Sequence, residues 1–117
     1  MTVEERTIGD VTILDVKGRL TVDAPGEVRL ADTVGSLVSH GRKRIILNLA
    51  AVSQVDSSGL CDVATASTAA VRDGGELKLL NPTARVRDLL VVTKLLTVLE
   101  AYDSEEAAVA SFPRPSA

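Results

Sequence analysis

The chain has 117 residues, of which 45% are hydrophobic and 25% charged, with a net charge of -3, and this predicts one acidic globular domain. The acidic balance, one Phe, one Tyr and no Trp argue against a nucleic-acid partner, so Arg42, Lys43 and Arg44 are interpreted as a solvated turn. The N-terminal MTVEERTIGD lacks a signal-peptide layout, and no apolar run approaches the roughly 18 to 20 residues of a membrane span. We therefore expect a cytoplasmic protein with no direct membrane contact.

The first half of the chain alternates strand and helix signals. The run VTILDV at residues 11–16 lies between turn signals and predicts a strand, paired in a hairpin with residues 3–8. Apolar residues at three- and four-residue steps between Pro25 and Gly41 predict an amphipathic helix. The apolar run RIILNL at residues 44–49 predicts a strand near the centre of the sheet.

The second half continues the alternation. Residues 57–72 predict a helix that ends at Asp73-Gly74-Gly75, with one face marked by Leu60, Val63, Ala64, Ser67, Ala70 and Val71. Further elements are predicted as a strand at 76–80, a helix from Pro82 to about Val92, a strand at 97–101 and a helix at 104–111. The tail at residues 112–117, FPRPSA, is expected to be frayed.

These elements predict an α/β fold. A single domain over residues 1–111 should hold a mixed sheet of four to five strands with about four helices. The crossovers after the third and fourth strands should be parallel and right-handed.

The stretch VDSSGL, at residues 55–60, lies where a predicted strand passes into a helix. Asp56 or Ser57 is therefore expected to cap the helix N-terminus, with the Ser57 hydroxyl pointing outward. Leu60 is expected in the core, and Ser58 in a local hydrogen bond in preference to a second phosphorylation site. A serine at a helix N-terminus can also carry a phosphate, because first-turn amides and the helix dipole favour an anion there.

The sequence argues against an enzyme with a serine nucleophile or a phosphate loop. Val55 and Asp56 stand where a Gly-x-Ser-x-Gly motif needs glycine, the one histidine, His40, is expected to be exposed, and Gly59 has no lysine after it. One cysteine forms neither an internal disulfide nor a Cys-based metal site, and no cofactor is expected. Cys61 is either a redox-sensing thiol or a small buried core residue, and we favour the second.

The order IILNLAAVSQVDSSGL, the Gly74-Gly75 turn into a strand and the Asn81-Pro82 helix start resemble the STAS family, most of all bacterial anti-sigma factor antagonists. The resemblance implies a non-enzymatic protein that binds an anti-sigma factor with serine kinase activity and so releases a sigma factor. It implies that phosphorylation at Ser57, the residue after the Asp, switches the protein off. The candidate partner contacts are Asp56, Ser57, Ser58, Gly59, Cys61, Asp62, Thr21 and Asp23. We expect a monomer or a weak dimer.

Two segments depart from the pattern of the family. The turn after the second strand often reads Gly-Glu-Leu-Asp, whereas this chain has Gly18-Arg19-Leu20-Thr21, and Asp23 is either a substitute acidic contact or a plain turn residue. A small and then an aliphatic residue usually follow Gly-Leu, whereas this chain has Cys61 and Asp62, which adds negative charge near the expected docking face. The alternative is a constitutive STAS scaffold or accessory subunit, in a stress-signalling assembly or a lipid-transport ATPase, without serine phosphorylation.

Overall fold

The computed structural model describes residues 2–20, 30–92 and 100–112. In these residues five strands form one sheet in the order β1-β2-β3-β4-β5. The strands are β1 (Thr2–Ile8), β2 (Val11–Leu20), β3 (Arg44–Val55), β4 (Glu76–Leu80) and β5 (Ala101–Tyr102). β1 and β2 form an antiparallel hairpin, and the pairs β2–β3, β3–β4 and β4–β5 are parallel. The predicted hairpin, the central position of β3 and the parallel crossovers after the third and fourth strands are confirmed.

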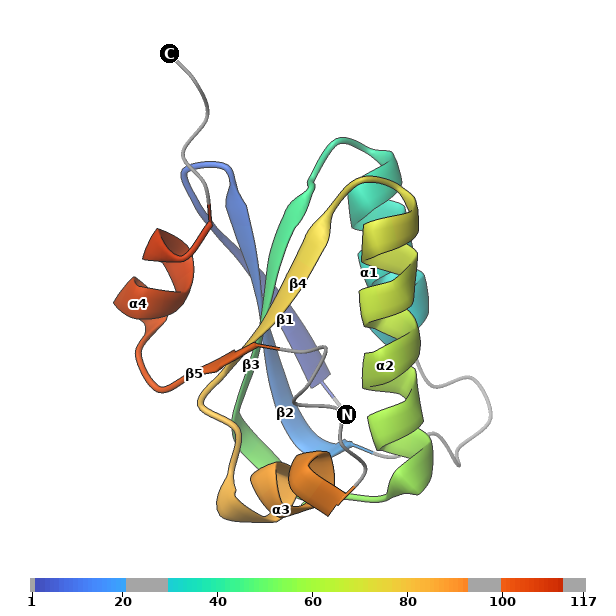
Figure 1. The fold of residues 1–117 in the computed structure, drawn as a ribbon, viewed down its shortest axis with the longest axis vertical. Helices are drawn as coiled ribbons and strands as arrows, with labels where there is room; N and C mark the ends of the chain where they lie inside the picture. The colour runs from blue at the N-terminus through green and yellow to red at the C-terminus, as the bar shows by residue number, and fades with distance from the viewer. Residues whose placement is uncertain (1, 21–29, 93–99, 113–117) are drawn as a thin grey trace.

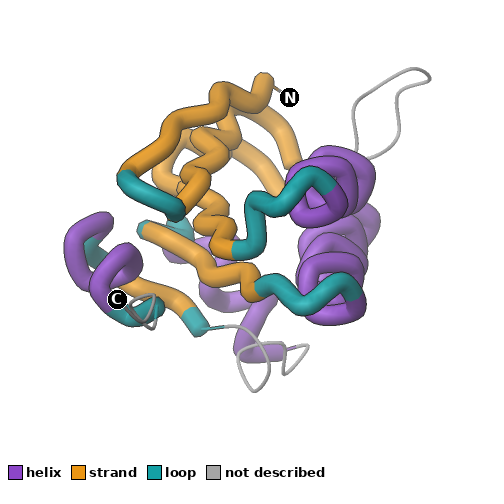
Figure 2. The backbone as a smooth tube through the Cα atoms, turned by 90° about the horizontal axis from the view of Figure 1, so that it is seen from above, coloured by secondary structure: helices purple, strands orange, loops and turns teal. Residues whose placement is uncertain are grey.

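Four helices accompany the sheet in the described part of the chain. They are α1 (Leu30–Ser39), α2 (Ser57–Arg72), α3 (Ala84–Val92) and α4 (Glu105–Ala110). α1 and α2 lie side by side on one face of the sheet, α4 lies on the other face, and α3 lies at one end (Figure 1, Figure 2). The predicted α/β class, with a mixed sheet and four helices, is therefore confirmed for the described residues.

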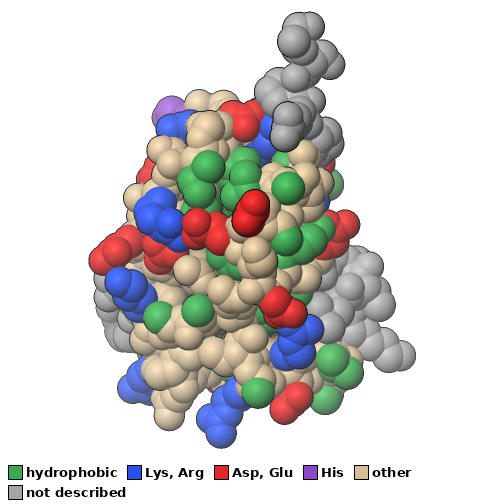
Figure 3. All heavy atoms as spheres, turned by 90° about the vertical axis from the view of Figure 1, so that its left-hand side faces the viewer, with side chains coloured by type: hydrophobic (Ala, Val, Ile, Leu, Met, Phe, Trp, Pro, Cys, Tyr) green, Lys and Arg blue, Asp and Glu red, His purple; other side chains and the backbone are tan. Residues whose placement is uncertain are grey.

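The alternation of side chains along the strands divides the core in two. The larger cluster lies between the sheet and the two helices α1 and α2 and includes Leu14, Val16, Leu47, Leu49, Leu60 and Val63. The smaller cluster lies under α4 and contains Val11, Ile13, Ile46, Leu80, Ala108 and Phe112. β3 contributes to both clusters, which explains its continuous apolar run, because a strand covered on two faces has no polar side. On the α4 side of the molecule, acidic and basic side chains are interspersed with hydrophobic ones (Figure 3).

Several predicted boundaries change in the structure. α2 and β4 have the predicted bounds, but β3 continues six residues past Leu49, because β2 stays paired with it as far as Leu20 and Val55. α3 begins at Ala84 and not at Pro82, since the Thr83 hydroxyl accepts a hydrogen bond from Val86 N at 3.4 Å, which is the geometry of a capping residue. The strand expected at 97–101 lies later in the chain, because β5 is Ala101–Tyr102 and Glu100 is not part of a strand. Residues 97–99 of the expected strand, like residues 25–29 of the expected first helix, lie outside the described residues.

The prediction that the frayed tail begins at Phe112 is wrong. Phe112 is 4% exposed, because its ring packs in the smaller cluster under α4. The Lys78 ammonium lies 4.7 Å from the centre of that ring, 3.3 Å from the Ser111 carbonyl oxygen and 2.9 Å from the Glu100 carboxylate. The chain is thus packed against the sheet through Phe112, and residues 113–117 lie outside the described residues.

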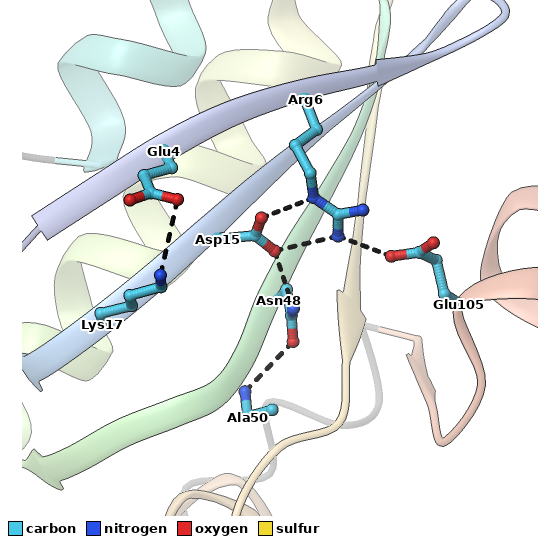
Figure 4. Close-up of polar contacts among 7 residues, drawn as sticks. All are labelled: Glu4, Arg6, Asp15, Lys17, Asn48, Ala50 and Glu105. Atoms are coloured by element: carbon cyan, nitrogen blue, oxygen red, sulfur yellow. Dashed lines mark hydrogen bonds and ion pairs between the residues drawn. The ribbon is translucent and has the colours of Figure 1, made fainter.

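A polar network crosses β1, β2 and β3 on the α4 side of the sheet (Figure 4). The Arg6 guanidinium donates to both oxygens of Asp15, at 2.5 and 3.0 Å, and to Glu105 Oε1 at 2.6 Å. Asn48 Nδ2 donates to Asp15 Oδ1 at 2.8 Å, and Asn48 Oδ1 accepts from Ala50 N at 3.2 Å. The network therefore ties the edge strand and α4 to the middle of β3.

Asn48 stands next to an irregularity in the pairing of β2 with β3. Asp15 pairs with Asn48, but Lys17 pairs with Ala51, so β3 holds one more residue than β2 over this interval. An extra residue leaves a backbone group without its ladder partner and bends the strand. The side chain of Asn48 accepts from the nearby Ala50 N–H, and β3 continues from this bulge toward α2.

The network predicts an acid-dependent stability. Hydrogen bonds from Arg6, aided by Asn48, hold the pKa of Asp15 below its usual range, although burial opposes the shift. A carboxyl whose pKa is lowered by folding stabilises the fold above its unfolded pKa of about 3.9, and this stability is lost as the pH falls through the folded pKa. Asp15→Asn should therefore lower the free energy of unfolding at pH 7, and the difference from wild type should shrink as the pH falls below about 4.

Urea unfolding between pH 2 and pH 7 measures this difference. Asp103→Asn, which removes a carboxylate whose side chain is 87% exposed, is the control for a general change in surface charge. A difference between wild type and Asp15→Asn that stays constant across the range would contradict the assignment.

The Thr12 hydroxyl has no hydrogen-bond partner among the described residues, and the residue is completely buried. Replacing a buried, unpaired hydroxyl by a methyl group of similar shape removes its desolvation cost. Thr12→Val should therefore raise the free energy of unfolding, measured by urea denaturation, by about 1 kcal/mol. Thr7→Val, at the exposed position opposite Thr12 on β1, should change it by less than about 0.5 kcal/mol. A loss of stability in Thr12→Val would show that the hydroxyl is satisfied in solution.

Candidate functional site

The turn between β3 and α2 is held by Asp56. Its backbone is extended, with φ of -124° and ψ of -179°, and Asp56 Oδ1 accepts from Gly59 N at 2.9 Å. Ser58 Oγ donates to the same oxygen at 2.6 Å. Of the two capping residues that the sequence left open, Asp56 is the one observed, and the local hydrogen bond expected of Ser58 is confirmed.

The electrostatics of this turn favour an ionised cap. The pKa of Asp56 is lowered, first by the hydrogen bond from the Ser58 hydroxyl and then by the Gly59 N–H. The positive charge of Arg19, on the neighbouring strand β2, acts in the same direction. An ionised carboxylate at this position also interacts favourably with the positive end of the α2 dipole.

Ser57 is the first residue of α2 and is exposed. Because Asp56 caps the helix, no capping bond requires the Ser57 side chain. Ser58 and Cys61 are also exposed, whereas Gly59 is buried and Leu60 is 3% exposed in the larger core cluster, as predicted for Leu60. The turn therefore exposes hydroxyl and thiol groups, while Leu60 holds its backbone against the core.

Three predictions about α2 are wrong. Cys61 was expected in the core, but it is exposed and lies one helical turn after Ser57. Asp62 was expected to add charge to the docking face, but it is 7% exposed and accepts hydrogen bonds from two backbone amides at the start of α1, Leu30 N at 2.7 Å and Ala31 N at 3.1 Å. The physical reason is that α2 is buried on two sides, by the sheet and by α1. The buried side of α2 therefore differs from the predicted apolar face, and Val71, which was expected on that face, is 64% exposed.

The remaining predicted contacts are Thr21 and Asp23, which lie outside the described residues. The residue before them, Leu20, pairs with Val55, and Arg19 pairs with Gln54. The end of β2 is therefore beside the Asp56 turn. Whether Thr21 and Asp23 contact a partner stays a prediction.

The described residues supply few groups for chemistry near Ser57. His40 is exposed, as predicted, and follows the C-terminus of α1, at the other end of the helix layer from the start of α2 (Figure 1). Its Nδ1 lies 2.7 Å from the Ser36 carbonyl oxygen. Within residues 2–20, 30–92 and 100–112, no group of three or more His, Cys, Asp or Glu side chains is arranged to hold a metal ion. No helix of this part of the chain is long and apolar enough to cross a membrane.

The sequence analysis missed two roles, the hydrogen bonds of Asn48 beside the β3 bulge and the capping of α1 by Asp62. Both residues carry a recognisable signal, because each places a polar side chain inside an otherwise apolar pattern. Such a side chain, when buried, requires a hydrogen-bond partner. The partner itself is not readable from the sequence, since Asp62 and Leu30 are 32 residues apart.

The chain is similar to proteins of one domain family. The STAS domain model matches residues 2–108, whereas no curated protein gives a significant match. Among solved structures, an anti-sigma factor antagonist from Mycobacterium paratuberculosis is 20% identical, with a TM-score of 0.76, over 94% of this chain and 92% of that chain.

Two further similar structures are forms of the protein SpoIIAA. The unphosphorylated anti-sigma factor antagonist SpoIIAA is 19% identical, with a TM-score of 0.68, over 93% of this chain and 94% of that chain. The phosphorylated form, named as a Bacillus cell fate determinant, is 21% identical, with a TM-score of 0.70, over 93% and 98%. At these identities the likeness shows the fold, and it extends over nearly the whole of each chain.

The capping role of Asp56 can be tested by replacement. Asp56→Ala removes the acceptor of the Gly59 N–H and should lower the melting temperature measured by circular dichroism, whereas Asp56→Asn keeps an acceptor oxygen and should lower it less. Ser57→Ala, one residue further on, should leave the melting temperature unchanged. An equal melting temperature for Asp56→Ala and wild type would show that α2 does not depend on this cap.

Proposed function

The chain belongs to the STAS domain family, and on this premise we propose that it is an anti-sigma factor antagonist controlled by phosphorylation of Ser57. In this proposal the protein is a non-enzymatic bacterial regulator of transcription and acts in the cytoplasm. It binds an anti-sigma factor that is also a serine kinase, and the sigma factor is released. The observation that carries the proposal is the exposed Ser57 at the first position of α2, beside a carboxylate that already caps the helix.

This geometry supports a switch that acts on the surface and leaves the fold intact. The Asp56 carboxylate already takes the Gly59 N–H, so a phosphate on Ser57 is not needed to complete the helix N-terminus. Phosphorylation adds about 1.5 to 2 negative charges. Together with the charge of Asp56, the turn would then carry roughly -2.5 to -3 at neutral pH.

Such a charge would act against a docked partner. Ser57, Ser58 and Cys61 are exposed together on the first turns of α2, and Ser53 and Gln54 are exposed on the strand that leads to them. Small and neutral side chains of this kind allow close approach of another surface. Burying a phosphate in such a contact requires removing its hydration, which is costly unless the partner supplies cations. Phosphorylation therefore releases the partner.

The proposal can be tested by capture from cells of the source organism. Wild type and Ser57→Ala should retain an anti-sigma factor kinase, identified by mass spectrometry, whereas Ser57→Asp should retain at least about tenfold less, equivalent to about 1.4 kcal/mol of binding. Ser36→Asp places the same charge on an exposed position of α1, away from the start of α2, and should behave as wild type. The melting temperatures of all four proteins should be similar.

The one cysteine of the chain supplies a second measurement. Cys61 is exposed one turn from Ser57, so a bound partner should slow its reaction with a maleimide, and phosphorylation should restore the rate. Incubation of the captured kinase with ATP should add one phosphate to wild type and none to Ser57→Ala, as measured by intact mass. A partner retained equally by wild type and Ser57→Asp, with no phosphate gained, would instead identify a constitutive STAS subunit.

A further inference from the structure

Asp62 is a buried carboxylate with a role that crosses between two helices. It belongs to the second turn of α2, yet its two oxygens accept from Leu30 N at 2.7 Å and Ala31 N at 3.1 Å. These amides are the first two of α1, where a helix leaves donors without partners inside the helix. A carboxylate at a helix N-terminus also interacts favourably with the helix dipole. Asp62 of the neighbouring helix α2 therefore caps these two amides of α1.

The same bonds hold one end of the connection between β2 and α1. The connection follows Leu20, the last residue of β2, which pairs with Val55 immediately before Asp56. It re-enters the described structure at Leu30, which is bonded to Asp62. Both of its ends are thus fixed to the segment that contains Ser57, one by the strand ladder and one by the Asp62 carboxylate.

We propose that Asp62 is a positioning residue for the surface around Ser57: its carboxylate holds the start of α1 against α2 and so sets where the β2–α1 connection ends relative to that surface. That this surface is a docking site rests on the proposed function. The positioning itself is a property of the free protein, so it is measurable without a partner.

Nuclear magnetic resonance of the full chain tests the proposal with Asp62→Asn. The amide keeps one acceptor oxygen and loses the other together with the charge, so hydrogen exchange at Leu30 and Ala31 should become about tenfold faster. The backbone amide resonances of residues 20–24 and 26–29 should also shift, whereas Pro25 has no amide proton. Asp62→Leu removes both acceptors and should enlarge both effects. If it does not fold, Asp62→Asn alone decides the result.

Two control variants separate positioning from general effects. Asp32→Asn removes an exposed carboxylate from the first turn of α1 and should leave the exchange at Leu30 and Ala31 and the resonances of residues 20–29 close to wild type. Val38→Ala weakens the buried side of α1 at its other end and should also leave the resonances of residues 20–29 unchanged. Exchange at Leu30 and Ala31 that does not change in Asp62→Asn would overturn the proposal. It would also be overturned if these amides changed while residues 20–29 kept their wild-type resonances, since Asp62 would then be a local cap.

Discussion

The path of β3 through the sheet is the constraint on which the Ser57 turn depends. β3 is paired with β2 along almost its whole length and with β4 as far as Asn48, and its side chains are buried on both faces of the sheet. Its direction is therefore fixed by two neighbours before it reaches the turn. The bulge beside Asn48 bends the strand. The Asn48 side chain holds that bend, because it donates a hydrogen bond to Asp15 and accepts one from the Ala50 N–H. Asp56 follows directly from the end of this strand.

The segment from Asp56 to Asp62 supplies the capping carboxylates of two helices. Asp56 caps α2, to which it is joined, and Asp62 caps α1, which packs beside it. One first-turn amide of α2, that of Gly59, and two of α1, those of Leu30 and Ala31, are thus bonded to carboxylates of the same segment. This arrangement leaves the Ser57 hydroxyl free of a capping role, so the proposed phosphorylation is expected to alter the surface and to leave the Asp56 cap intact. The apolar anchor of the segment is Leu60, in the core between the sheet and the helices.

A division between the two faces of the sheet follows from the same architecture. The face covered by α1 and α2 holds the larger core and leads to the Ser57 turn. The opposite face holds α4 through apolar contacts with Phe112 and Ala108 and through the bond from Arg6 to Glu105. The Asn48 side chain lies on this second face, but it fixes the path of β3. Because the side chains of β3 point to both faces of the sheet, the path of the strand also sets the positions of those that pack against α1 and α2. Acid conditions that protonate Asp15 are therefore expected to weaken packing at some distance from the proposed phosphorylation site.

The amino-acid sequence by itself determined the class of fold, the bounds of α2 and β4, the central strand and the position of the DSSGL turn. These follow from local patterns, because apolar periodicity, glycine turns and capping residues act over a few positions of the chain. The tertiary structure decided what depends on neighbours distant in sequence. β3 extends to Val55 because β2 lies beside it, and Phe112 is buried because it follows α4, which packs on the sheet. Cys61 is exposed and Asp62 is buried because α2 packs against α1 as well as against the sheet. The helical periodicity of a sequence does not show on which side a second element packs against the helix.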